Sequence, residues 1–288
     1  MDALLPIPKT LTERDFPTRV VSVTSGKGGV GKTNVVANLA AALTFAGKRV
    51  AAVDGALGLA NLNLLLGVRP QYDLGDFFAG QQTLPDIFAT SPLGIIVLAA
   101  TNGEPWMTSL SGEQKLSFLS ALEASPNLVD IMLVDTASGV SDTVTYFASA
   151  AHENILVVTP EPTSLMSTAA LVKVLASRHG ERSFRVVANT VDNEIEARQL
   201  LAALWQTIPR YIHISFSLLG WIPRDPALTL AVSQQQLVVQ TAPHSPSAQA
   251  FTHLAHRLIA LMAEGARVKA GLQFFFRGVL AASLEEKR

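Results

Sequence analysis

A glycine-rich segment that contains two lysines has the clearest chemistry in this sequence. It reads Gly-Lys-Gly-Gly-Val-Gly-Lys-Thr over residues 26–33 and matches the pattern G-x-x-x-x-G-K-[ST]. An apolar run precedes it and a stretch of helical character follows it. In such a loop the backbone N–H groups bind phosphate oxygens, and the positive end of the following helix adds to the attraction. The segment therefore predicts a phosphate-binding loop, and the alternative is a glycine-rich turn with an incidental surface lysine.

Separate roles can be assigned within this loop. Lys32 is expected to reach the β- and γ-phosphates of a nucleotide, and the Thr33 hydroxyl is expected to bind Mg²⁺. The predicted nucleotide-binding residues of the loop are Gly28, Gly29, Val30, Gly31, Lys32, Thr33 and Asn34.

Short apolar, β-branched runs alternate with helical stretches along the chain. The runs cover residues 20–24, 50–54, 95–100, 131–135, 155–160, 186–189 and 218–223, and helical stretches include residues 34–47, 164–176 and 247–262. This alternation predicts an α/β fold with three layers and a doubly wound, mostly parallel sheet. We expect an N-terminal tail over residues 1–19, one domain over residues 20–262 and an appended segment over residues 263–288.

Composition excludes several classes of protein. The 288 residues include 22 Lys+Arg and 23 Asp+Glu, and this balance disfavours a large basic face, so no direct nucleic-acid partner is expected. The absence of cysteine excludes disulfides, thiolate zinc sites, iron–sulfur clusters and a cysteine nucleophile. The sequence has no recognisable secretory signal and no apolar run of about 18 residues, so a cytoplasmic protein is expected.

The second lysine of the loop, Lys27, makes GKGGVGKT resemble the deviant Walker A motif of the MinD/ParA family of ATPases. The resemblance implies a P-loop NTPase fold, ATP and Mg²⁺ as cofactors, and an ATP-dependent homodimer. In that family the extra lysine reaches the nucleotide of the partner subunit, which implies catalytic roles for Lys27 and Lys32. It also implies contacts across the dimer for Lys27 and Glu161, the latter within TPEPTS. The alternative for Lys27 is a solvated loop lysine.

Further residues match the family in the expected order. Asp135, at the end of VDIMLVD, resembles the Walker B aspartate, and the implied metal-binding set is Thr33, Asp54 and Asp135. Asn189, at the end of RVVAN, resembles the asparagine that reads adenine, since its amide suits the edge of the base. The segment Pro223, Arg224 and Asp225 resembles the loop that packs beside the adenine in this family. The alternative for each is an ordinary residue at a strand end or in a loop.

Residues 53–67, VDGALGLANLNLLLG, resemble the switch region VDxDLGLANxDxLLG of the flagellar-number regulators called FlhG or FleN. The resemblance extends over about residues 20–280. It implies a dimerising ATPase that controls flagellar number and flagellar gene expression. The implied partners are a σ54-dependent flagellar activator of the FleQ type and the GTPase FlhF. A DQAxxLR motif, which some members carry for stimulating FlhF, is not found in residues 1–19.

Ala56 is the main departure from this pattern, because the family has a second aspartate there. That carboxylate orients or activates the attacking water, and a methyl group cannot do so. We therefore expect ATP binding to be retained and hydrolysis to be impaired, with Asp54 serving the metal and its water shell. Two other functions remain open: a ParA-like positioning ATPase that rides on DNA, and a nucleotide-binding adaptor that does not hydrolyse ATP.

An apolar face is predicted near the C-terminus, where Leu272, Phe275, Phe276 and Val279 share one side of a helix. Nearby basic residues suit anionic lipid, and some family members bind membrane through a terminal helix. The resemblance therefore implies a peripheral position on the cytoplasmic membrane. The alternative is that this face docks onto the protein's own core.

Overall fold

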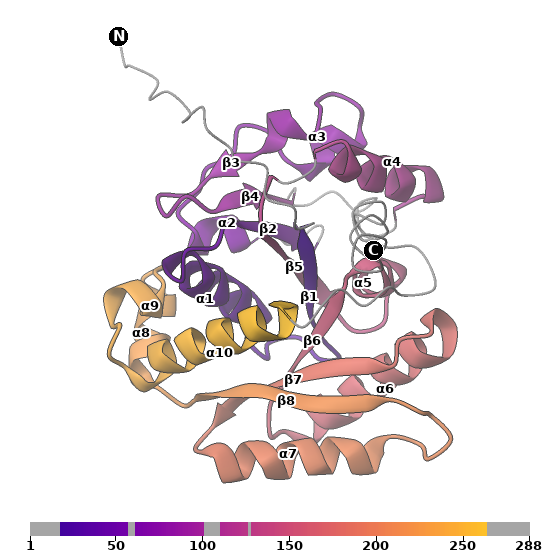
Figure 1. Ribbon diagram of the computed structural model, residues 1–288, viewed down its shortest axis with the longest axis vertical. Helices are drawn as coiled ribbons and strands as arrows, with labels where there is room; N and C mark the ends of the chain where they lie inside the picture. Colours follow the sequence, from indigo (N-terminus) through magenta and orange to yellow (C-terminus); the bar gives the residue numbers. More distant parts are fainter. Residues whose placement is uncertain (1–17, 57–60, 101–109, 126–127, 264–288) are drawn as a thin grey trace, which may run out of the picture.

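An eight-stranded sheet runs through the middle of the computed structural model (Figure 1). The structure describes residues 18–56, 61–100, 110–125 and 128–263. The strand order is β3-β4-β2-β5-β1-β6-β7-β8, and neighbouring strands are parallel except for β3 and β4. The strands are β1 (Arg19–Ser25), β2 (Val50–Gly55), β3 (Ala89–Thr90), β4 (Ile96–Leu98), β5 (Ile131–Ser138), β6 (Glu153–Val158), β7 (Ser183–Val191) and β8 (Ser215–Pro223).

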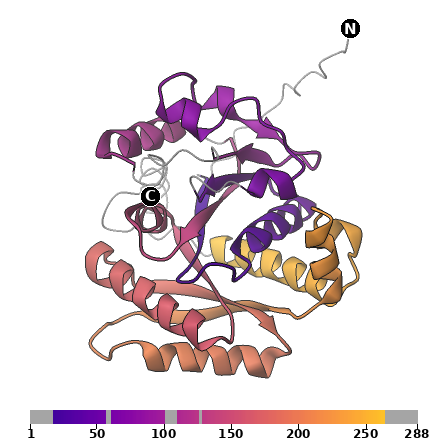
Figure 2. The ribbon, with the colours of Figure 1, turned by 180° about the vertical axis from the view of Figure 1, so that it is seen from behind.

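Helices cover both faces of this sheet (Figures 1 and 2). One face packs against α1 (Lys32–Phe45) and α10 (Pro246–Ala263), which contact each other, and against the short helices α2 (Leu62–Leu65), α8 (Pro226–Ser233) and α9 (Val238–Thr241). The other face packs against α3 (Leu74–Phe78), the 3₁₀ helix η1 (Pro85–Ile87), α4 (Gly112–Glu123), α5 (Asp142–Ala150), α6 (Pro162–His179) and α7 (Glu194–Thr207). The predicted three-layer α/β fold is confirmed.

The side chains of the central strands alternate between the two faces of the sheet, and both faces are buried. In β1, Val21 and Val23 face the cluster under α1 and α10, whereas Val20 faces the cluster under α4 and α5. In β6, Ile155 and Leu156 divide between the two faces in the same way. A strand buried on both sides favours apolar residues at most positions, and this explains the apolar runs seen in the sequence. Ser22 and Thr24 are buried polar exceptions in β1.

The seven runs predicted as strands all contain strands, and the three predicted helical stretches correspond to α1, α6 and α10. The short strand β3 was not predicted, because two residues are too few to leave a pattern. The structure places the start of β1 at Arg19 and the end of α10 at Ala263. The predicted membrane face, from Leu272 to Val279, lies outside the described residues. No helix in the described part of the chain is long and apolar enough to cross a bilayer.

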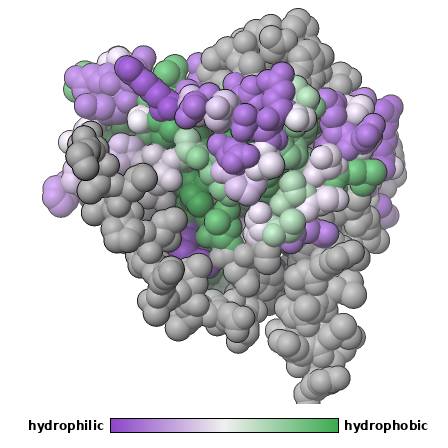
Figure 3. All heavy atoms as spheres, turned by 90° about the horizontal axis from the view of Figure 1, so that it is seen from above, coloured by the Kyte–Doolittle hydropathy of each residue, from purple (hydrophilic) through white to green (hydrophobic). Residues whose placement is uncertain are grey.

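The end of the molecule where α3 and α4 lie has an aromatic cluster. Phe77 and Phe78 pack edge to face, and both contact the buried Phe118 of α4. Figure 3 shows the molecule from this end, with hydrophobic surface lying between hydrophilic areas. This cluster holds the α3–α4 layer onto the sheet beside β2 and β4.

Candidate functional site

The glycine-rich segment forms the connection between β1, which ends at Ser25, and α1, which begins at Lys32. Gly29 and Gly31 have φ angles of 77° and 89°, a left-handed conformation that favours glycine. A side chain at Gly26 would come within 2.0 Å of the backbone of Ser167 in α6. The loop therefore needs glycine both for its own turns and for the close approach of α6. The sequence pattern predicted the first need but not the second.

Lys32 is held inside this loop. Its Nζ donates to the Ser25 hydroxyl at 3.0 Å, and that hydroxyl donates to the carbonyl of Lys27 at 2.7 Å. Burial lowers the pKa of Lys32, and the nearby Asp135 opposes this shift by favouring the positive charge. A desolvated ammonium gains most from a strong anionic partner, so this position suits phosphate oxygens.

Asp54 and Asp135 are direct neighbours on the parallel strands β2 and β5. Burial raises the pKa of Asp135 to about 7, and the charge of Asp54 adds to the shift. A hydrogen bond from Thr33 and the charge of Lys32 act in the opposite direction. Strand register therefore brings Asp54 and Asp135 together at one end of the sheet, and Thr33, in the first turn of α1, is hydrogen-bonded to Asp135 there.

Unpartnered buried oxygens suggest that this end of the sheet accepts a ligand. Asp135 Oδ1 is buried and has no hydrogen-bond partner among the described residues, and the same is true of Asn34 Oδ1 in the first turn of α1. A hard cation such as Mg²⁺ would satisfy Asp135, and the adjacent Thr33 hydroxyl would be a second oxygen ligand. The described residues contain no cluster of three or more His, Cys, Asp or Glu that could hold a metal ion.

Asp54 has a structural task that the sequence did not reveal. Burial raises its pKa to about 6, although its carboxylate accepts hydrogen bonds from the backbone N–H groups of Leu62, Ala56 and Asn61. The carboxylate thus anchors both sides of the segment that follows β2. Ala56 donates at 3.1 Å through its backbone, and its methyl side chain provides no carboxylate.

At the other end of the site, Asn189 joins β7 to the phosphate loop. Its Nδ2 donates to the carbonyl of Val30 at 2.8 Å, and its Oδ1 accepts from the N–H of Thr190 at 3.0 Å. A side chain at Gly31 would come within 2.6 Å of Nδ2. Asn189 can therefore position the loop, and its second amide hydrogen could still bind a base.

The predicted adenine loop follows β8, the strand next to β7. Pro223 ends β8, and the Arg224 Nε donates to Asp192 Oδ1 at 3.2 Å. Asp225 caps α8 by accepting from Ala227 N, and it also accepts from the Ser247 hydroxyl at 2.6 Å. The pairing of β7 with β8 thus places this loop next to the end of β7, where Asn189 lies. The role of Ser247 in fixing it to α10 was not predicted.

Lys27 lies at the rim of the loop and forms an ion pair with Glu161, which precedes α6. Both side chains are exposed to solvent, at 36% for Lys27 and 57% for Glu161. The structure brings these residues together within one chain, whereas the family resemblance implied contacts between chains. The pairing joins two segments far apart in the sequence, and no local pattern could have predicted it.

Known proteins share this arrangement. The family model described as "CobQ/CobB/MinD/ParA nucleotide binding domain" matches residues 21–238. The antiactivator FleN of Pseudomonas aeruginosa is 39% identical over 242 residues, which cover 84% of this chain and 86% of FleN. The flagellum site-determining protein YlxH of Helicobacter pylori is 29% identical over 276 residues, covering 95% of this chain and 93% of YlxH. The septum site-determining protein MinD of Pyrococcus horikoshii, complexed with Mg-ADP, has a TM-score of 0.68 and 27% identity, covering 87% of this chain and 100% of MinD. This chain belongs to the CobQ/CobB/MinD/ParA nucleotide-binding family.

Proposed function

We propose that this protein is an ATP-dependent, dimerising regulator of flagellar number and flagellar gene expression, similar to FleN and FlhG. The main support is the 39% identity to the antiactivator FleN, which extends over 84% of the chain. The similarity to the flagellum site-determining protein YlxH over 95% of the chain points to the same class. The proposed location is the cytoplasm, with a peripheral membrane position as one state.

ATP and Mg²⁺ are the proposed cofactors. Lys32 would bind the β- and γ-phosphates, while the loop N–H groups would surround the phosphate chain. Thr33 and Asp135 would hold Mg²⁺, which supplies charge neutralisation at the phosphates when bound. Asn189 and the loop of Pro223 to Asp225 would contact the base. The Mg-ADP bound to the MinD of P. horikoshii supports this choice of ligand.

Dimerisation would exchange the partner of Lys27. An exposed ion pair contributes only about 0–1 kcal/mol, so Lys27 can leave Glu161 at little cost. A triphosphate on a facing subunit would be a stronger partner for this lysine. The exposed apolar side chains of Val140 and Met166 support an interface at this rim. Each lies within two residues, along the chain, of a serine that is close to the phosphate loop. Ser138 is close to Gly28, and Ser167 is close to Gly26.

Impaired hydrolysis is proposed because Ala56 lacks the carboxylate that the family uses to position water. A long-lived ATP dimer would follow. In that state the proposed protein partners are a σ54-dependent activator of the FleQ type and the GTPase FlhF. The word antiactivator in the name of FleN fits a partner of the first kind.

A size measurement combined with a cellular test would examine this proposal. Light scattering should give a monomer without nucleotide and with ADP, and a dimer with ATP and Mg²⁺. Producing this chain in P. aeruginosa that lacks FleN should change the flagellar number per cell. A dimer that is unaffected by nucleotide would contradict the switch, and unchanged flagellar counts would contradict the flagellar function.

Ala56 also favours a second candidate, a nucleotide-binding adaptor that never hydrolyses ATP. The two functions differ in phosphate release over many hours at high protein concentration. Slow but measurable release that Lys32→Ala abolishes would support the regulatory ATPase. Release no faster than that of free ATP would support the adaptor.

Membrane binding through residues 271–288 is the remaining part of the proposal. The predicted face of Leu272, Phe275, Phe276 and Val279 should bind anionic liposomes when the protein is an ATP dimer. Removing residues 271–288 should abolish co-sedimentation and leave ATP binding unchanged. If the intact ATP dimer does not sediment with liposomes, the terminal face docks on the protein itself instead.

A further inference from the structure

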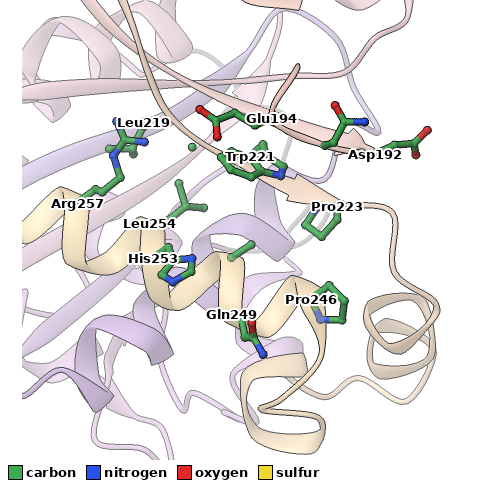
Figure 4. Close-up of a pocket in the computed structure, with 13 residues that line it drawn as sticks. Asp192, Glu194, Leu219, Trp221, Pro223, Pro246, Gln249, His253, Leu254 and Arg257 are labelled. Atoms are coloured by element: carbon green, nitrogen blue, oxygen red, sulfur yellow. The ribbon is translucent and has the colours of Figure 1, made fainter. Parts of the chain in front are cut away.

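A cavity of about 390 Å³ opens at the outer edge of the sheet, between β8, α10 and the turn from β7 into α7 (Figure 4). Its volume lies in the range of about 300–1,000 Å³ that is usual for ligand pockets. Trp221, Leu219 and Leu254 provide apolar surface in it. Pro223, which belongs to the proposed base-contacting loop, lines one end of the cavity, whereas Asn189 and Asp225 are not among its lining residues. The cavity therefore adjoins the proposed nucleotide site and extends away from it along β8 and α10.

Two fixed contacts between β8 and α10 hold the cavity open. At one end Arg257 donates to the carbonyl of Leu218 at 2.9 Å, and Gly220 allows Leu254 to approach closely. At the other end Ser247 is hydrogen-bonded to Asp225, just beyond β8. The cavity thus lies along a line where β8 and α10 are joined at both ends, and we call it the seam.

The seam is long enough for a short extended peptide, and it lies along a strand edge to which such a peptide could add. The helical stretch from Pro246 to Arg257 lines it and rises about 16 Å at about 1.5 Å per residue. An extended peptide of about five residues has this length, at about 3.3 Å per residue. β8 is the last strand in the described sheet, so one of its edges has no neighbouring strand. Extended peptides commonly bind by adding to such an edge.

The helical wall of the seam has one positive charge, that of Arg257, and no negative charge. Helix α10 contains no aspartate or glutamate, and its side chains in the cavity include His253 and Arg257. The guanidinium of Arg257 is bonded to a backbone carbonyl, and it forms no ion pair with any residue in the described ranges. Its positive charge is therefore available to a ligand.

The opposite wall contains two carboxylates, but both are already paired. Asp192 accepts from Arg224 at 3.2 Å, and Glu194 accepts from Arg198 at 2.5 Å. These pairs lower the attraction of this wall for a basic ligand, and their carboxylates also disfavour a polyanion such as nucleic acid. A ligand that complements the cavity would therefore have one carboxylate to pair with Arg257 and an apolar group next to that carboxylate.

We propose that this seam binds an extended acidic peptide segment of a partner protein. The peptide backbone lies along the free edge of β8, and an apolar side chain enters the cavity against Trp221 and Leu254. A carboxylate of the peptide binds Arg257, where a charge-assisted and bidentate contact is possible. This site goes beyond the proposed nucleotide switch, because it assigns a surface and a chemistry to partner recognition.

A random octapeptide library displayed on phage is the probe for this site. It is selected on the full-length protein with saturating ATP and Mg²⁺, and the enriched peptides are synthesised for fluorescence anisotropy. We expect Asp or Glu within about two residues of Leu, Ile or Phe in these peptides. Arg257→Gln should weaken their binding by at least about tenfold. Gln249→Trp, which fills the seam from an exposed position of α10, should weaken it similarly.

Arg178→Gln, at an exposed position near the end of α6, is the matched control and should change binding by less than about twofold. All variants should bind ATP as the unmodified chain does, which shows that they are folded. The proposal is overturned if no peptide is enriched, if Arg257→Gln binds the peptides normally, or if the peptides compete with ATP. Binding of anionic vesicles or an oligonucleotide that depends on Arg257, without peptide binding, also overturns it.

Discussion

The two lysines of the phosphate loop lie close together in the sequence and in very different surroundings. Lys32 is half-buried, this burial lowers its pKa, and its ammonium donates to Ser25 inside the loop. Lys27 is at the rim, where both it and its partner Glu161 are exposed. The same residue type therefore occupies a partly desolvated position, at Lys32, and a solvent-exposed position, at Lys27, within a single motif.

This difference separates binding from assembly. A charge interaction in a desolvated position is strong because little water competes for the charged groups. An exposed ion pair is instead screened by water and salt. Lys32 is suited to hold a nucleotide within its own chain. Lys27 is suited to leave one partner for another, which a nucleotide-dependent interface requires.

The largest effect is expected when the half-buried Lys32 is removed. Lys32→Ala should weaken Mg-ATP binding by at least about hundredfold, or about 2.7 kcal/mol, because a desolvated cation facing the phosphates is lost. Isothermal titration calorimetry would measure this change. Lys173→Ala, at an exposed position of α6, is the control and should leave the affinity unchanged. Retained affinity in Lys32→Ala would mean that the loop does not bind phosphate as proposed.

Removing the exposed Lys27 should affect dimerisation strongly and ATP binding little. Lys27→Ala should change ATP binding to one chain by less than about threefold, since an exposed pair contributes little. It should weaken the ATP dimer by at least about 2 kcal/mol, or about thirtyfold, because a charge contact between subunits is lost. Sedimentation equilibrium with ATP would measure the dimer.

Glu161→Gln is the matched variant for Lys27, because it removes the charge of the partner and keeps the shape. If the pair acts only within one chain, this variant should form the ATP dimer as well as the unmodified protein or up to about fivefold better. Weaker dimerisation in Glu161→Gln would instead support a contact of Glu161 with the partner subunit. An ATP dimer that survives Lys27→Ala would refute the exchange of partners.

A third prediction concerns Ala56, which follows the buried Asp54. Restoring a carboxylate with Ala56→Asp should raise ATP turnover by at least about tenfold, because a positioned carboxylate can orient the attacking water. It should also shorten the lifetime of the ATP dimer. Phosphate release measures the first effect, and subunit exchange between labelled dimers measures the second. Equal turnover in both proteins would show that another group, such as Asp54, positions the water.

Local patterns in the sequence were sufficient for the frame of the site. The glycine-rich loop and the apolar runs predicted the parallel sheet, and the polar residues at the ends of the runs were expected at the edge where such folds bind ligands. Parallel register does this automatically, because strand ends that lie together bring their residues together.

Contacts between distant segments could not be predicted in the same way. The pairing of Lys27 with Glu161 and the approach of Ser167 to Gly26 depend on where α6 packs. The three hydrogen bonds to Asp54 depend on the path of the chain after β2. The seam between β8 and α10 depends on helix placement, which alternation of apolar residues does not specify.

The smallest predicted effect concerns the contact between Ser247 and Asp225, in which a neutral side chain is hydrogen-bonded to a charged one. Ser247 is fully buried and donates to Asp225 through both its hydroxyl and its N–H, at 2.6 Å and 3.0 Å. Burial alone would raise the pKa of Asp225, but these hydrogen bonds and one from Ala227 hold it below its ordinary value. A carboxyl with a depressed pKa stabilises the fold above its unfolded pKa of about 4, and this stabilisation is lost as the pH falls through the folded pKa.

Ser247→Ala should therefore lower the free energy of unfolding by about 1 kcal/mol near neutral pH, since one hydrogen bond to a charged acceptor is removed. The difference from the unmodified protein should shrink below about pH 4, where the carboxylate becomes protonated in both proteins. Urea unfolding over this pH range would measure both values. Ser233→Ala, which removes an exposed hydroxyl bonded to Leu230, is the control and should cost less at every pH. A difference that does not depend on pH would mean that Ser247 acts through packing, and that the charge of Asp225 does not hold the adenine loop to α10.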